Sequence, residues 1–183
     1  MATKKKGLAR ELMGWVAYVA LLILAVNLIT TYVGQRVRVE GTSMEQTLHD
    51  GDALLLNKIS YRFKDPERYD IIVFPFQGNE DEKYIKRIIG MPGETIQIDD
   101  TGTIYINGEV LNEDYGAEVI EDPGTAAQPI TLGDDEYFVM GDNRNWSSDS
   151  RAEEVGLIKR DKILGKAFIR IWPLKSFKVL KHQ

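Results

Sequence analysis

The chain of 183 residues contains no cysteine, which excludes disulfide bonds, thiolate metal sites and a cysteine nucleophile. It has two histidines, His49 in a Leu-His-Asp-Gly turn and His182 beside the C-terminus, and neither is well placed to act as a catalytic base. A His-Glu-x-x-His motif and a Gly-x-x-x-x-Gly-Lys-Ser/Thr loop are also missing. We therefore expect no metal and no cofactor.

Positive charge is scarce outside the N-terminus. The chain has 23 basic and 28 acidic residues, for a net charge of −5. Because residues 1–35 contain four of the basic residues and one of the acidic ones, the remainder carries a net charge of −8. An acidic body argues against nucleic acid as a partner, and ordinary solubility is a sufficient explanation of the charge.

One long uncharged run, from Leu12 to Gln35, stands out in the sequence. It is long enough to cross a bilayer as a helix. Four positive charges precede it, whereas Arg36 and Arg38 follow with Glu40 beside them. The positive-inside bias therefore predicts a single-pass protein of the plasma membrane with a cytoplasmic N-terminus and an extracytoplasmic body.

A cleaved export signal is the alternative interpretation, because it shares the basic start and the apolar core. Such signals usually have a shorter core followed by small residues at the cut site. Here the run is long and ends in Thr-Thr-Tyr-Val-Gly, which favours an anchor that is retained. We expect a basic cytoplasmic segment (1–11), a membrane helix (12–35) and one extracytoplasmic domain (36–183).

The body reads as mainly β, because helical periodicity is poor outside the apolar run. Alternating or short apolar segments bounded by turn residues predict strands at 36–40, 52–57, 70–76, 84–90, 94–99, 103–106, 109–111, 136–140 and 163–172. Asn107-Gly108 is a hairpin signature. Residues 95–135 are expected to form a hairpin and a mobile insertion, and within it the acidic stretch 112–129 is predicted to be a mobile loop or a small insertion.

Ser43 is a candidate nucleophile, because it follows the first predicted strand in a glycine-containing turn. A serine hydroxyl needs a base, and Lys86 is the candidate, on one face of a predicted strand with Tyr84 and Ile88. Burial lowers the pKa of a lysine, and a base working near pH 8 to 9 costs the fold roughly 2 to 3 kcal/mol. Taken alone, the two residues are better explained as a turn serine and an edge lysine whose amine reaches water.

Three segments, in order along the chain, resemble the signature motifs of bacterial type I signal peptidases, and a fourth is similar to a further motif. The three are Gly41-Thr-Ser43-Met44-Glu-Gln-Thr47-Leu48, Tyr84-Ile85-Lys86-Arg87-Ile88-Ile89-Gly90-Met-Pro92-Gly93-Glu94 and Gly141-Asp142-Asn143-Arg144-Asn-Trp-Ser147-Ser-Asp149-Ser150-Arg151, and the fourth is Arg68-Tyr-Asp70-Ile-Ile-Val-Phe74. With the apolar run ahead of them, the resemblance covers nearly the whole chain, in the single-anchor form of the family.

The resemblance implies a signal-peptidase-like β-barrel or sandwich that removes signal peptides from exported preproteins. Ser43 would attack the scissile carbonyl and Lys86 would act as general base, through an acyl-enzyme. Its partners would be signal peptides and the lipid bilayer, without nucleic acid or metal. Part of the family has a serine that donates to the oxyanion where this chain has Gly41, so we expect the backbone N–H of Ser43 to serve.

Further residues of the last motif have supporting roles by resemblance. Ser147 matches a serine that hydrogen-bonds the lysine, and Asp149 and Arg151 match a pair that forms a salt bridge. Asp142 and Arg144 lie in the same loop. Without the other motifs, these residues are ordinary turn chemistry.

The resemblance also implies shallow apolar pockets that accept small residues, as in Ala-x-Ala sites, on an extended peptide. Candidates to line them, with core packing as the alternative for each, are Val37, Val39, Met44, Leu48, Tyr84 and Ile85. One departure from the family is Gln46, which stands where proline is expected. Since proline fixes φ near −65°, we expect a looser turn after the nucleophile.

Two rival functions remain. A self-cleaving repressor shares the Ser/Lys β-fold, but it would need a DNA-binding domain where this chain has its apolar run. An inactive, membrane-tethered β-domain that binds exported chains has only Gln46 in its support, and the intact pair of Ser43 and Lys86 argues against it.

Overall fold

The structure, a computed structural model, describes residues 2–28, 30–31, 34–116 and 118–180. His182 lies outside these residues. In chain order the elements are α1 (Ala2–Leu28), β1 (Gly34–Arg38), β2 (Ala53–Asn57), β3 (Ile71–Phe76), β4 (Asn79–Gly90), β5 (Thr95–Ile98), β6 (Ile104–Ile106), β7 (Glu109–Val110), β8 (Ile130–Thr131), β9 (Glu136–Met140), β10 (Ile158–Lys159), β11 (Gly165–Trp172) and β12 (Lys178–Val179). Short 3-10 helices occur at Ser60–Arg62, Gly124–Ala127, Arg160–Lys162 and Leu174–Ser176.

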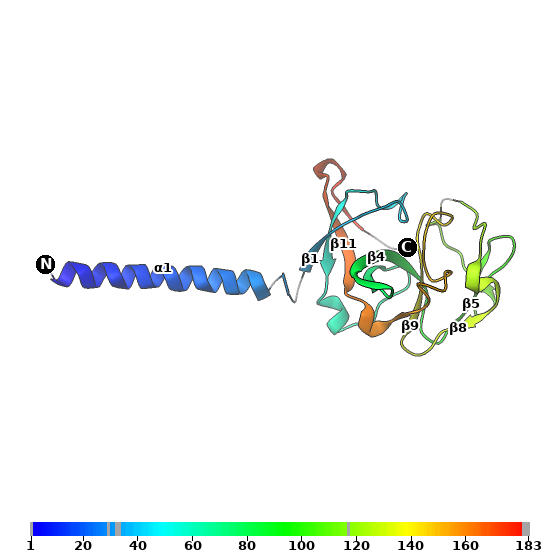
Figure 1. The fold of residues 1–183 in the computed structure, drawn as a ribbon, viewed down its shortest axis with the longest axis horizontal. Coiled ribbons are helices and arrows are strands. Elements are labelled where there is room, and N and C mark those ends of the chain that lie inside the picture. Colours follow the sequence, from blue (N-terminus) through cyan, green and yellow to red (C-terminus); the bar gives the residue numbers. More distant parts are fainter. Residues whose placement is uncertain (1, 29, 32–33, 117, 181–183) are drawn as a thin grey trace.

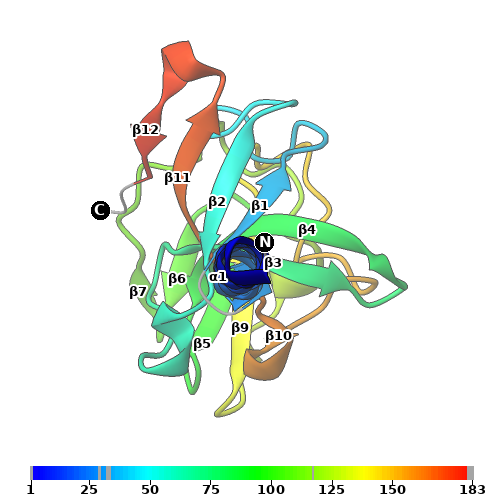
Figure 2. The same cartoon turned by 90° about the vertical axis from the view of Figure 1, so that its left-hand side faces the viewer.

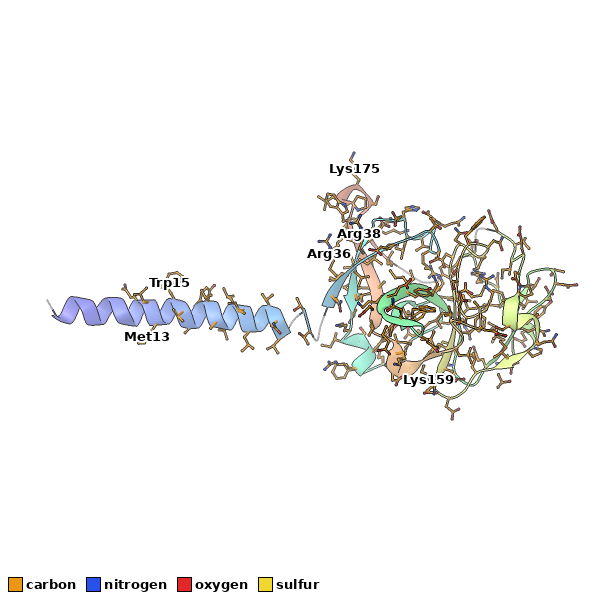
Figure 3. All side chains as sticks on the ribbon, in the orientation of Figure 1. Met13, Trp15, Arg36, Arg38, Lys159 and Lys175 are labelled. Atoms are coloured by element: carbon orange, nitrogen blue, oxygen red, sulfur yellow. The ribbon has the colours of Figure 1, made fainter. Side chains whose placement is uncertain are left out.

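Helix α1 projects away from the rest of the molecule (Figure 1). Its segment Glu11–Leu28 is apolar and makes no buried contact with the body, and the side chains of Met13 and Trp15 point into open surroundings (Figure 3). At 1.5 Å per residue, 18 residues are about 27 Å long, close to the thickness of the hydrocarbon core of a bilayer. The length and exposure of α1 suit a membrane span.

The helix and the predicted span 12–35 overlap but do not coincide. The helix begins at Ala2, within the predicted basic segment, and ends at Leu28. At the other end of the predicted span, Gly34 and Gln35 belong to β1, where they pair with Asn57 and Leu56 of β2. Gly34 and Gln35 therefore belong to the body, because they pair with β2. The sequence placed them in the span because they are uncharged.

The body consists of two antiparallel sheets, which confirms the mainly β prediction. The larger sheet has the strand order β1-β2-β11-β3-β4-β9-β10, with β12 beside β11, and the smaller has the order β7-β6-β5-β8. Seen along α1, the larger sheet curls so that β1 and β4 lie near one another (Figure 2). The predicted hairpin joins β6 and β7, and both of its turn residues, Asn107 and Gly108, have the positive φ that this turn requires.

The position of β3 inside the body explains why its sequence is a continuous apolar run. Its residues are buried on both faces, so Ile71 and Val73 pack in the cluster that includes Leu54 and Leu56 of β2. Ile72 and Phe74 pack in a separate cluster on the opposite face. A third cluster lies between the smaller sheet and β9. Strand β3 and its neighbour β4 thus form a rigid platform.

The ladder beside β4 brings the last sequence motif to Lys86. Strand β9 pairs with the second half of β4, where Arg87 lies opposite Met140. Because β9 ends at Met140, the loop that begins at Gly141 leaves the sheet next to Lys86. The sheet register therefore places the two motifs together.

The described parts of the acidic stretch, residues 112–116 and 118–129, contact the body. Ile120 and Ala126 are buried in the cluster under the smaller sheet. Glu113 forms an ion pair with Arg144 of the loop that follows β9. The acidic stretch, for which the sequence predicts a mobile loop or a small insertion, thus includes a carboxylate with a specific buried partner.

Candidate active site

Ser43 and Lys86 meet at the edge of the curled sheet. The Nζ of Lys86 lies 2.7 Å from the Oγ of Ser43, within hydrogen-bonding distance, although the residues are 43 positions apart. Lys86 is held on β4, where it pairs with Ile72 of β3, and Ser43 lies in the turns that follow β1. The structure thus joins the two residues that the sequence singled out.

The amine of Lys86 is almost wholly buried, with 4% of the residue exposed. Burial lowers the pKa of Lys86 from 10.5 to about 8, because the charged form loses its hydration. The carboxylates of Asp149 and Asp142 raise this pKa in part, while the charge of Arg151 lowers it. About one tenth of the molecules would carry a neutral amine at pH 7.

The turn that carries Ser43 is fastened to the loop after β9. The backbone N–H of Asn143 donates to the carbonyl oxygen of Ser43 at 3.1 Å, and the side-chain amide donates to that of Thr42 at 3.1 Å. A Cβ atom on Gly141 would lie 2.4 Å from the carbonyl oxygen of Ser43, so only glycine fits there. Sequence analysis missed Asn143, whose only signal was its place in the last motif.

Asp149 and Arg151 form the salt bridge that the resemblance implied. The Nε and Nη2 of Arg151 donate to the two carboxylate oxygens of Asp149 at 2.8 and 2.9 Å. The same carboxylate accepts from the N–H of Gly141 at 3.0 Å. The pair therefore fixes the start of the loop that holds Ser43 in place.

Asp142 has a buried partner, Arg87, that the sequence did not identify. Two nitrogens of Arg87 donate to the carboxylate of Asp142 at 2.8 and 2.6 Å, and a third donates to the carbonyl oxygen of Tyr69. The centroid of the Tyr115 ring lies 3.6 Å from the guanidinium carbon of Arg87. As Arg87 follows Lys86 on a strand, its side chain leaves the opposite face of β4.

Ser147 lies behind Gly141, and its Oγ is buried without a hydrogen-bond partner among the described residues. A Cβ atom on Gly141 would lie 2.3 Å from this oxygen. The hydrogen bond to Lys86 that the resemblance implied is not formed in this conformation, in which the lysine contacts Ser43 instead.

A cleft of about 510 Å³ opens beside the pair, between β1 and the first half of β4. The ladders of the described residues leave these two edges unpaired, since β1 pairs with β2 and β9 reaches only the second half of β4. The residues that line the cleft are Gln35, Arg36, Val37, Arg38, Val39, Glu40, Gly41, Thr42, Ser43, Met44, Asp81, Glu82, Lys83, Tyr84, Ile85, Lys86, Trp146 and Ser148. Trp146, which sequence analysis missed, is 76% exposed at the rim.

Most of the predicted pocket residues line this cleft, with one correction. Val37, Val39, Met44, Tyr84 and Ile85 are among the lining residues. Leu48 is not, because its side chain is fully buried in the cluster with Leu54 and Leu56. For Leu48, core packing is the correct alternative.

Gln46 adopts a backbone conformation that proline cannot. Its φ is 86°, in the left-handed region, whereas proline is restricted to φ near −65°. The turn is closed by hydrogen bonds from the N–H groups of Thr47 and Leu48 to the carbonyl oxygen of Met44. With glutamine at this position, the chain forms a turn of a different conformation from the one that proline would allow, and not a looser form of that turn.

His49, the described histidine, is not in the cleft lining. Its Nδ1 lies 2.5 Å from Oε2 of Glu45. It has no contact with Ser43 that would make it a catalytic base.

Comparison with known proteins agrees with the motifs. The family described as "Signal peptidase, peptidase S26" matches residues 12–172. A "Probable signal peptidase I-2" of Synechocystis sp. is 42% identical over an alignment of 161 positions, gaps included, which covers 85% of this chain and 71% of that protein. A "Signal peptidase IB" of Staphylococcus aureus is 31% identical over an alignment of 184 positions, gaps included, which covers 92% of this chain and 94% of that protein.

A solved structure is also similar. The crystal structure of a signal peptidase I from Enterococcus faecalis has 38% sequence identity and a TM-score of 0.47, over 56% of this chain and 97% of that chain. With the family match over most of its length and the curated relatives, the chain belongs to the peptidase S26 family, as a serine endopeptidase of the bacterial signal peptidase I type.

Proposed function

We propose that this chain removes the signal peptides of exported preproteins by acyl-enzyme catalysis, with Ser43 as nucleophile and Lys86 as general base. The observation that carries the proposal is the 2.7 Å separation of Lys86 Nζ and Ser43 Oγ. When the amine is neutral, it takes the hydroxyl proton as the oxygen attacks the scissile carbonyl. The same proton is then given to the leaving amine, and water hydrolyses the ester.

The oxyanion of the tetrahedral intermediate is assigned to the backbone N–H of Ser43. Among the described residues this N–H donates to no protein acceptor. The N–H of Gly41 donates to Oδ1 of Asp50 at 2.9 Å and is already engaged. A preorganised donor at this position stabilises charge that develops only during the reaction.

The substrate is assigned to the cleft between β1 and β4. An extended peptide can pair with unpaired strand edges, which offers backbone recognition without reference to sequence. Val39, Met44 and Ile85 line this cleft and are almost wholly buried, so they contribute apolar surface to its floor. We assign to this floor the preference for alanine at the −1 and −3 positions over larger residues that the resemblance implies.

The topology follows from α1 and the flanking charges. We assign α1 to a single crossing of the plasma membrane, with the N-terminus cytoplasmic and the β body extracytoplasmic. The lipid bilayer is then a permanent partner, and the cleft lies on the side to which preproteins are exported.

The direct test is cleavage of a synthetic peptide with an Ala-x-Ala site, with the products identified by mass. The full-length protein should cut after the second alanine, and Ser43→Ala and Lys86→Ala should each abolish cleavage. Lys159→Ala is the matched control, because Lys159 is exposed on β10 outside the cleft lining (Figure 3). Since a general base contributes at least about a hundredfold, a Lys86→Ala rate above about a tenth of the parent would exclude this mechanism.

A further inference from the structure

Trp146 is a large aromatic residue that the fold leaves exposed at the mouth of the cleft. It is 76% exposed, although it lines the same cleft as Ser43 and Lys86. Within the described part of the chain, the indole contacts no other aromatic ring and no cationic group. Single exposed apolar residues are common on proteins, so the position of this one decides whether it has a role.

The backbone around Trp146 is held in place. Its N–H donates to the carbonyl oxygen of Asn143 at 3.1 Å. The side chain of Asn145 donates to the carbonyl oxygen of Val119 at 2.9 Å and accepts from the N–H of Glu121 at 3.0 Å. The exposed indole therefore extends from a backbone that is fastened to the body on the side away from the cleft.

The loop that carries Trp146 runs along the cleft from Ser43 to Tyr84. At one end of the loop, Asn143 donates to the carbonyl oxygen of Ser43. At the other end, the side chain of Ser148 lies next to that of Tyr84, and both line the cleft. Because Trp146 lies between Asn143 and Ser148 in the sequence, its place along the cleft is between Ser43 and Tyr84.

These places correspond to residues of an extended substrate. Under the proposed function, Ser43 attacks the carbonyl carbon of the −1 residue. Tyr84 lies two positions before Lys86 on β4, about 7 Å along the strand, which is also the spacing of the −1 and −3 residues of an extended chain. Trp146 therefore lies at the level of the −2 residue.

The side chain of the −2 residue points toward the mouth of the cleft. Neighbouring side chains of an extended chain point to opposite faces. Since the −1 and −3 side chains are assigned to the floor formed by Val39, Met44 and Ile85, the −2 side chain points away from that floor. The exposed indole of Trp146 lies on this outer side.

We propose that Trp146 is a specificity-determining residue, whose indole packs against the −2 side chain of the substrate and favours aromatic and large apolar residues there. The inference rests on the proposed function, from which it takes the assignment of the −1 and −3 residues. Contact between two aromatic side chains contributes about two- to tenfold to binding. Alanine at −2 is too small to cover the indole.

A contact of this kind changes KM rather than kcat. The −2 side chain does not react, so its contact with the indole is the same in the bound substrate and in the transition state. Such uniform binding lowers KM and leaves kcat unchanged. A residue that positions Ser43 would change kcat instead, so the two kinetic constants separate a substrate contact from a structural role.

The test measures kcat and KM of the full-length protein on two sets of synthetic peptides with an Ala-x-Ala site. The first set has alanine, leucine or phenylalanine at −2, and the second has the same three residues at +1 with alanine at −2. Trp146→Ala removes the indole, and Trp146→Phe keeps an aromatic ring. Phe63→Ala is the matched control, because Phe63 is an exposed aromatic residue outside the cleft lining.

In the parent protein and in Phe63→Ala, we expect KM to be about fivefold lower with phenylalanine than with alanine at −2, and leucine to be intermediate. Trp146→Ala should make these KM values equal without changing kcat on the alanine peptide, whereas Trp146→Phe should keep most of the difference. A preference at −2 that survives in Trp146→Ala overturns the proposal, and so does an effect of this variant that is confined to the +1 set.

The same measurements separate this proposal from the proposed function. If the parent protein cuts none of the peptides after the second alanine of the site, the proposed function fails. If it cuts them there with the same KM for alanine and phenylalanine at −2, the proposed function stands and only the role of Trp146 fails.

Discussion

The backbone N–H of Asn143 donates to the carbonyl oxygen of Ser43, 100 positions earlier in the chain, at a distance of 3.1 Å. The side-chain amide of Asn143 holds the neighbouring carbonyl oxygen of Thr42. Ser43 is thus positioned by the loop that also contains the salt bridge of Asp149 and Arg151. Four predictions test this arrangement.

Asn143→Ala should lower kcat on a peptide substrate by about tenfold or more, because small displacements of a nucleophile are costly. The backbone bond to Ser43 remains, so the free energy of unfolding should fall by only about 1 kcal/mol. Asn145→Ala is the control, since that side chain contacts the carbonyl oxygen of Val119 instead. Equal rates for the two variants would show that the amide of Asn143 does not position Ser43.

The rate on a soluble peptide should rise with pH as Lys86 loses its proton. The neutral amine is the active form, and burial lowers the pKa of Lys86 to about 8, so kcat/KM should increase about tenfold per pH unit below that value and level off above it. A profile from pH 6 to 10 measures this. A flat profile would contradict a lysine base.

Lys86→Met should stabilise the fold near neutral pH. Burial lowers the pKa of Lys86 from 10.5, its value in the unfolded chain, to about 8, so the unfolded state binds the proton more tightly and the cost of the buried ammonium is about 3 kcal/mol below pH 8. The parent protein therefore gains stability as pH rises from about 8 to 10.5.

The measurement for this variant is the Tm of both proteins in detergent at several pH values. The advantage of Lys86→Met should be largest near pH 7 and shrink as pH rises through that window. If Lys86→Met raised the Tm by the same amount at every pH, burial of the charged amine of Lys86 would not destabilise the parent protein.

Gln46→Gly should stabilise the protein by up to about 1 kcal/mol, because glycine occupies positive φ without the steric cost that glutamine bears. Gln46→Pro should destabilise it by at least about 2 kcal/mol, although proline is the expected residue in the family, since the φ of 86° is closed to proline. The Tm of each variant, compared with that of the parent protein, checks whether stability rises for Gln46→Gly and falls for Gln46→Pro. A higher Tm for Gln46→Pro would show that the turn follows the proline-compatible path.

Local sequence was sufficient for the family and for the mainly β fold, because the alternating runs, Asn107-Gly108 and the three motifs each lie within a short stretch. The same patterns selected Ser43 and Lys86, whose catalytic roles remain proposals. The boundary of the membrane span remains a prediction too, because hydropathy alone cannot tell the last residues of a helix from the first residues of an uncharged strand.

Other features were decided only by the tertiary structure, because they depend on groups far apart in the chain. Pairing with β2 assigned Gly34 and Gln35 to the body, and the curl of the larger sheet brought Asn143 to Ser43. The apolar side chain of Leu48 suits a core position and a pocket position equally well, and only its packing in the structure distinguished the two. Periodicity and composition report which residues are buried or charged, whereas partners, such as Glu113 for Arg144, are set by how separate strands fold together.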